Sequence, residues 1–147
     1  MKEIIINEIQ KQINIKNRVK EQEQQKDNNE FNKGYRKALL KATNTNIEML
    51  EYLFTQASKT TFLEELNKEK IYYLDIKNEL MSKDKIIIGQ YNFGFESAKI
   101  EENDLRLELL EFIYKMSQIT KSNKYNSKEI QTNTSEDTLK KPQHLLK

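Results

Sequence analysis

The chain has one histidine, His144, which lies close to the C-terminus. A histidine that acts as a general base has to be held within hydrogen-bond reach of the proton that it removes. The segment around it, residues 121–147, is rich in Ser, Thr, Asn and Lys and poor in apolar residues, which predicts a flexible tail. Because such a tail does not position a side chain, we do not expect His144 to be catalytic.

Other residue types that carry chemistry are present without the spacing that the chemistry needs. The carboxylates Glu101, Glu102 and Asp104 cluster, but no ligand-loop spacing accompanies them, and they predict a solvated helix face. Gly89 and Gly94 match neither nucleotide-binding fingerprint. The absence of cysteine excludes disulfides, thiolate metal sites and cysteine nucleophiles. We therefore expect a non-enzymatic protein without a metal or a cofactor.

Basic residues offer a second kind of chemistry, which is contact with nucleic acid. Lys33, Arg36, Lys37 and Lys41 cluster, and residues 121–147 add further lysines. Lysines alone can contact phosphates and give salt-dependent, non-specific affinity. Base readout favours arginine, of which the chain has 3 against 22 lysines. A nucleic-acid-associated accessory protein is therefore an alternative function.

The composition indicates what kind of fold must hold these residues. With 147 residues the chain has the length of one domain, and 33% of its residues are charged. One proline and three glycines favour long helices joined by few turns. No stretch approaches the ~20 apolar residues of a membrane span. We expect an all-α protein of the cytoplasm or of a virion, and the abundance of Lys, Asn and Ile suggests an AT-rich source such as a phage or a mobile element.

One phrase occurs twice in the sequence. Residues 31–54 and 91–114 align without gaps and share six identities, among them Asn32/Asn92, Gly34/Gly94 and Ala38/Ala98. Aromatic residues also match aromatic residues, and aliphatic residues match aliphatic ones. The similarity does not continue into residues 61–80 and 121–140. The sequence therefore contains an internal repeat with helical periodicity.

Each copy of the repeat predicts a helix with an apolar stripe and a Gly-x-x-x-Ala notch near its start. Glycine inside a helix costs about 1 kcal/mol relative to alanine, so two matching glycines suggest close approach of another helix. The alternative is that both glycines lie at helix starts, where they cost little. Leu105 also falls on the second apolar stripe. The predicted interface consists of Phe31, Gly34, Tyr35, Ala38, Asn46, Met49, Leu53, Tyr91, Gly94, Phe95, Ala98, Glu102, Arg106, Leu109 and Ile113.

The middle of both stripes is polar. Glu102 and Arg106 have the i,i+4 spacing of a favourable ion pair, and we expect them to act as a unit facing Asn46 of the other copy. A polar layer of this kind can fix register and partner choice. The alternative is a solvated groove or a helix break, because residues 43–46 have poor helix propensity and Thr45 with Glu48 would form a capping box.

The two copies differ in charge, since residues 31–60 carry a net charge of +3 and residues 91–120 a net charge of −3. Helices of opposite charge with the same stripe can pair within one chain or between chains. We therefore expect a helical assembly or protein-interaction protein that binds a protein partner, in the first place a second copy of itself. A small inhibitor of a host enzyme is a second alternative, because such a protein needs no motif.

The rest of the chain completes an elongated bundle of three or four helices. Thr61 and Glu64 form a capping box that starts a helix over residues 61–82. The first 30 residues favour a helix, which could stand apart from the rest, although residues 3–7, 13–15 and 85–89 are rich in isoleucine and could be short strands. We expect one helical domain over residues 1–120 and the flexible tail after it.

Overall fold

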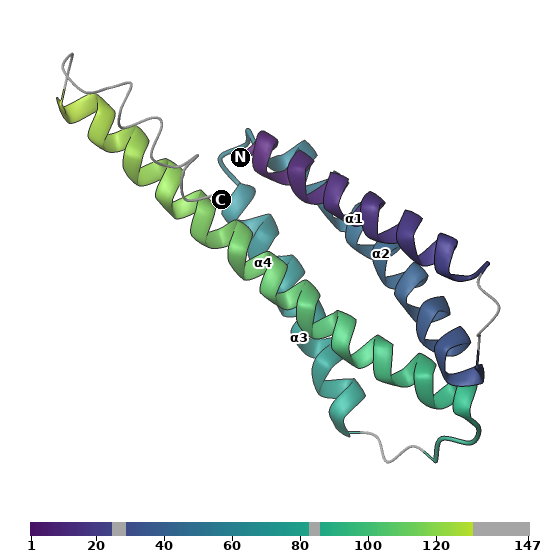
Figure 1. Ribbon diagram of the computed structural model, residues 1–147. Helices are drawn as coiled ribbons and strands as arrows, with labels where there is room; N and C mark the ends of the chain where they lie inside the picture. The colour runs from purple at the N-terminus through teal and green to yellow at the C-terminus, as the bar shows by residue number, and fades with distance from the viewer. Residues whose placement is uncertain (25–28, 83–85, 131–147) are drawn as a thin grey trace.

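The computed structural model describes residues 1–24, 29–82 and 86–130, with side chains as far as residue 120. The described residues form four helices and no strand, which confirms the all-α fold. The helices are α1 (Lys2–Gln22), α2 (Glu30–Gln56), α3 (Phe62–Ser82) and α4 (Gln90–Ile130), and together they make an elongated bundle (Figure 1). Helix α3 begins directly after Thr61, as its capping-box sequence predicts.

The N-terminal segment is a single helix, so the alternative of short strands there is wrong. Ile4, Ile5 and Val19 are buried on one side of α1, and this side packs on α2. The second isoleucine run, Ile86–Ile88, lies in neither a helix nor a strand. It leads into Gly89, whose φ of 89° is a backbone conformation that favours glycine.

Helix α2 is continuous, so the break that we considered at residues 43–46 is not present. It begins instead after Asn29, whose side chain accepts a hydrogen bond from the backbone N–H of Asn32 at 2.7 Å. The hydroxyl of Thr43 donates to the carbonyl of Leu40 at 2.9 Å, and Thr43 is fully buried. Burial against the neighbouring helices therefore overrides the weak helix propensity of this stretch.

The bundle consists of two helical hairpins. Helix α1 runs antiparallel to α2, α3 runs antiparallel to α4, and the long helices α2 and α4 lie parallel to each other in the centre (Figure 1). Helices α1 and α3 have 21 residues each. Helix α3 starts 60 residues after α1, at residue 62 against residue 2. Helix α4 likewise starts 60 residues after α2, at residue 90 against residue 30. The repeat is therefore a whole hairpin rather than one helix.

The buried positions of α1 and α3 correspond when they are aligned with a shift of 61 residues. This alignment pairs Ile5 with Leu66, both fully buried, and Ile15 with Ile76, both half-buried. The main apolar core lies where the second half of α2, the first half of α3 and the middle of α4 meet the start of α1. It contains Ile5, Met49, Leu50, Leu53, Phe62, Leu66, Tyr73, Leu110 and Ile113.

Helix α4 continues as far as Ile130, ten residues into the segment for which the sequence predicts a tail. Figure 1 shows this end of α4 extending beyond the other helices. Residues 131–147, with His144 and most of the predicted tail, lie outside the described residues.

Candidate functional site

Gly34 and Gly94 form a close crossing between α2 and α4. A Cβ atom built on Gly34 would overlap the carbonyl oxygen of Tyr91, and one built on Gly94 would overlap the carbonyl oxygen of Phe31. Tyr91 and Phe31 are themselves equivalent positions of the repeat. This reciprocal pattern is typical of a two-fold contact between like surfaces. The close approach inferred from the Gly-x-x-x-Ala spacing is therefore present, and it occurs within one chain.

Small and aromatic side chains continue this crossing. Ala38 and Ala98 are 4% and 0% exposed, so the two helices stay close over the next turn. Phe31 packs against Phe93 with 5.7 Å between the ring centroids. Tyr91, in contrast, lies at the margin of the contact and is 37% exposed.

The next layer shows how the charge difference between the copies is accommodated. The hydroxyl of Tyr35 donates to Glu101 at 2.7 Å, and this bond raises the pKa of Tyr35 to about 12. At the equivalent positions, the ammonium group of Lys41 lies 5.2 Å from the centroid of the Phe95 ring. A carboxylate thus accepts from a phenol hydroxyl, and a cation lies over a ring without a hydroxyl, so the two contacts join equivalent positions with opposite charge.

Arg106 occupies the centre of the buried polar layer. Its Nε donates to Asn46 Oδ1 at 2.5 Å, and its Nη2 donates to the carbonyl of Ala42 at 3.3 Å. Its Nη1 donates to Asn103 Oδ1 at 3.4 Å, and its guanidinium lies 4.9 Å from the centroid of the Tyr73 ring. The expected contact between Arg106 and Asn46 is therefore present and joins equivalent positions of the two copies.

Asn46 links this layer to α1. Its amide Nδ2 donates to Gln12 Oε1 at 2.9 Å. On the other side, Asn103 Nδ2 donates to the backbone carbonyl of Tyr73 at 3.1 Å. Gln12 and Tyr73 correspond in the alignment of α1 with α3. Each outer helix therefore accepts a hydrogen bond from the polar layer at an equivalent position.

Glu102 is buried, 8% exposed, but makes no ion pair with Arg106 among the contacts of the described residues. Burial raises the pKa of Glu102, and the nearby charge of Arg106 opposes this shift only in part. Burial likewise lowers the pKa of Arg106. Arg106 therefore bonds to Asn46, and Glu102 is a second buried charge one turn before it on the same helix.

We expect Glu102→Gln to raise the melting temperature at pH 7. A carboxyl group whose pKa is raised by folding stabilises the fold below its ordinary value of 4.5, and this contribution is lost as the pH rises through the raised pKa. Glutamine keeps the shape and removes the charge. The difference between variant and parent should shrink toward pH 4, measured by thermal unfolding over a pH series.

The exposed Glu48→Gln on α2 is the matched control for this prediction. It should leave the melting temperature nearly unchanged at both pH values. A melting temperature of Glu102→Gln below that of the parent at pH 7 would show that the charge of Glu102 stabilises the fold.

The remaining predicted interface residues lie in the core or at its edge. Met49, Leu53 and Ile113 are buried, and Leu109 is half-buried. Leu105, which we expected on the buried stripe, is 53% exposed, because Arg106 and not Leu105 turns toward α2 at this level.

The basic residues that the sequence singles out have different surroundings. Lys33 and Lys37 are exposed, and Lys33 pairs with Glu30 at 3.2 Å. Arg36 is half-buried, and Lys41 lies over the ring of Phe95. Lys33, Lys37 and Lys41 therefore follow one face of α2, with Lys33 in an ion pair and Lys41 over an aromatic ring.

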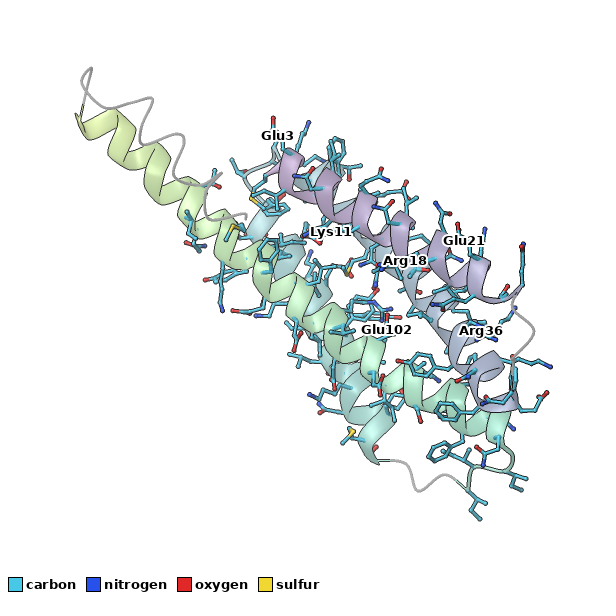
Figure 2. The ribbon with its side chains drawn as sticks, in the orientation of Figure 1. Glu3, Lys11, Arg18, Glu21, Arg36 and Glu102 are labelled. Carbon is cyan, nitrogen blue, oxygen red and sulfur yellow. The ribbon has the colours of Figure 1, made fainter. Side chains whose placement is uncertain are left out.

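The clustered carboxylates of α4 do not converge. Glu101 accepts from Tyr35, Asp104 pairs with Lys77 at 3.2 Å, and Glu102 points into the space between α1 and α4 (Figure 2). In the part of the chain that the structure describes, no group of three or more Asp, Glu, His or Cys side chains is arranged to hold a metal ion.

Exposed apolar residues lie around the end of α3 and the start of α4. The sequence pattern did not predict that they are exposed. We call this surface the apolar end. Ile86 is 90% exposed, Ile88 76% and Met81 67%, and Phe93 and Ile87 are also exposed. Three successive isoleucines without alternating polar residues are a signal for it, although the same run also fits a short strand.

The described residues form four helices, arranged as two related hairpins that pack as a two-fold pair. No known protein family, curated protein or solved structure matches the chain. None of the described helices has a stretch long and apolar enough to cross a lipid bilayer.

Proposed function

We propose that this chain is a non-enzymatic helical protein that acts by binding another protein, in the first place a second copy of itself. The observation that carries the proposal is the apolar end, which consists of Met81, Ile86, Ile87, Ile88 and Phe93. Three successive isoleucines that are exposed at the end of a bundle, with further exposed apolar residues on the adjoining helix ends, are typical of an interaction surface.

The apolar end replaces the two notched stripes as the surface offered to a partner. Gly34 and Gly94 already pack against each other within one chain, so a partner cannot use them without separating α2 from α4. A second copy suits the apolar end, because a two-fold contact would cover the same apolar residues on both chains at once.

The mass in solution tests the proposal. We expect the mass measured by light scattering to rise above 17.6 kDa as the protein concentration increases. The variant Ile86→Asp/Ile88→Asp should associate at least about tenfold more weakly, because burying one isoleucine is worth about 1.5–3 kcal/mol and 1.4 kcal/mol is tenfold in affinity.

Ile6→Asp is the matched control, since Ile6 is 49% exposed on α1, at the opposite end of the bundle from the apolar end (Figure 1). It should associate like the parent. A parent chain that stays at the monomer mass over the whole series contradicts self-association, and equal weakening by Ile6→Asp contradicts the assignment to the apolar end.

A second candidate function, association with nucleic acid, is supported by the row of lysines on α2. Lys33, Lys37 and Lys41 are all exposed at a spacing of four residues. The protein should then shift the electrophoretic mobility of a labelled DNA or RNA, and the shift should weaken as the salt concentration rises. The variant Lys33→Gln/Lys37→Gln should give a weaker shift.

A further inference from the structure

Two grooves flank the central helices and correspond to each other through the repeat. One, of about 450 Å³, lies between α2, α3 and α4, and we call it the basic groove. The other, of about 560 Å³, lies between α1, α2 and α4, and we call it the acidic groove. Equivalent residues line both, for example Phe95 and Tyr35, and Ile76 and Ile15.

The grooves have opposite charge. Among the described residues, the charged side chains of the basic groove are Lys41, Lys99 and Arg106, with no carboxylate. The acidic groove contains Glu8, Glu102 and Glu108 together with Lys11, and Figure 2 shows Lys11 and Glu102 on the sides of α1 and α4 that face each other. The basic groove has Lys99 where the acidic groove has Leu39, so the two grooves differ in charge although equivalent positions line them.

Arg106 forms the floor of the basic groove. It is 7% exposed and makes no ion pair with a carboxylate of the described residues. A guanidinium has five N–H donors, and Asn46, Ala42 and Asn103 accept one bond each. Two N–H groups therefore remain beside the groove. Burial disfavours the charge of Arg106, and nearby Glu102 offsets this only in part, so an anion in the groove would lower the remaining cost.

Aromatic and aliphatic side chains form part of the walls of the groove. They are Phe95, Tyr72, Tyr73, Ile76 and Leu80, and the guanidinium of Arg106 lies 4.9 Å from the centroid of the Tyr73 ring. The volume falls within the range of small-molecule sites. A bare inorganic anion would leave these walls uncovered, whereas a flat apolar group attached to the anion would fill the space between them.

We propose that the basic groove binds a small organic anion, with its carboxylate or phosphate held by Lys41, Lys99 and Arg106 and its flat apolar group between Phe95, Tyr72 and Ile76. The site does not depend on self-association, because the apolar end is a separate surface and none of its five residues lines the groove.

Calorimetric titration of the full chain with phenyl phosphate and benzoate tests this assignment. Both should bind, and inorganic phosphate and benzylamine should bind at least tenfold more weakly. Lys41→Gln/Lys99→Gln should weaken the binding of phenyl phosphate at least tenfold. Both lysines are exposed at the rim, so the double variant should keep its helical circular dichroism.

Lys37→Gln is the matched control, because Lys37 is an exposed lysine of α2 that does not line the groove. It should bind phenyl phosphate like the parent. The proposal is overturned if neither organic anion binds at millimolar concentration, or if Lys37→Gln weakens binding as much as the double variant. Equal affinity for inorganic phosphate would overturn the role of the apolar walls.

Discussion

Alanine at Gly34 or Gly94 is expected to destabilise the fold by about 1–3 kcal/mol, and leucine by more. A methyl group at either position would overlap a backbone carbonyl oxygen of the opposite helix, Tyr91 or Phe31. A backbone carbonyl cannot rotate away as the end of a side chain can, so α2 and α4 would have to move apart. This separation would also loosen the contact between Ala38 and Ala98 on the next turn.

The sign of the change in stability distinguishes a close crossing from a glycine at a helix start. In an exposed helix, replacing glycine with alanine stabilises by about 1 kcal/mol, so a glycine that merely lies near a helix start would give a more stable variant. Denaturant midpoints of Gly34→Ala and Gly94→Ala should both fall. Asn44→Ala on the exposed side of α2 is the control and should be neutral or slightly stabilising. If the denaturant midpoints of both glycine variants rise instead, the close crossing does not stabilise the fold.

The features that the sequence predicted well are those that depend on local periodicity. The helical stripes, the start of α3 after Thr61 and the all-α fold follow from spacing and capping. The two matching glycines also predict close approach of another helix, and the structure shows that α2 and α4 approach each other in this way within one chain. The sequence alone did not decide between a partner helix in the same chain and one in a second chain.

The features that were missed depend on contacts between distant residues. Propensity at residues 43–46 allowed a break, but Thr43 is buried and its hydroxyl is satisfied by Leu40. The relation between α1 and α3 was hidden, because their buried residues align with a shift of 61 while α2 and α4 align with a shift of 60. A single ungapped comparison cannot show both shifts.

The two copies also show why charge alone did not identify the partner of each residue. The sequence gives α2 and α4 opposite charge, yet Lys41 faces Phe95 and Glu101 faces Tyr35 rather than each other. In the same way, Arg106 bonds to the neutral Asn46 and not to Glu102. In a two-fold pair, equivalent or exchanged positions meet, and the chemistry of each contact then adapts to that geometry.

Arg106→Met is expected to destabilise the fold by about 2–4 kcal/mol, because it leaves buried acceptors without a donor and each unsatisfied group costs about 1–3 kcal/mol. The acceptors are Asn46 Oδ1, Asn103 Oδ1 and the carbonyl of Ala42. Asn46→Leu should also be costly, since it removes the partner of both Arg106 and Gln12. The double variant should cost clearly less than the sum of the two single ones.

A double-mutant cycle on Arg106 and Asn46, scored by denaturant midpoints, should therefore give a coupling energy of about 1 kcal/mol or more, within the range found for residues in one hydrogen-bond network. The control cycle uses Lys70 and Glu111, an interhelical ion pair at 2.8 Å whose side chains are 30% and 42% exposed. Exposed pairs of this kind contribute about 0–1 kcal/mol, so its coupling should be smaller. If Arg106 and Asn46 couple no more strongly than Lys70 and Glu111, their bond adds nothing to the pairing of α2 with α4. The close crossing at the two glycines and the apolar core would then have to hold the two hairpins in register without it.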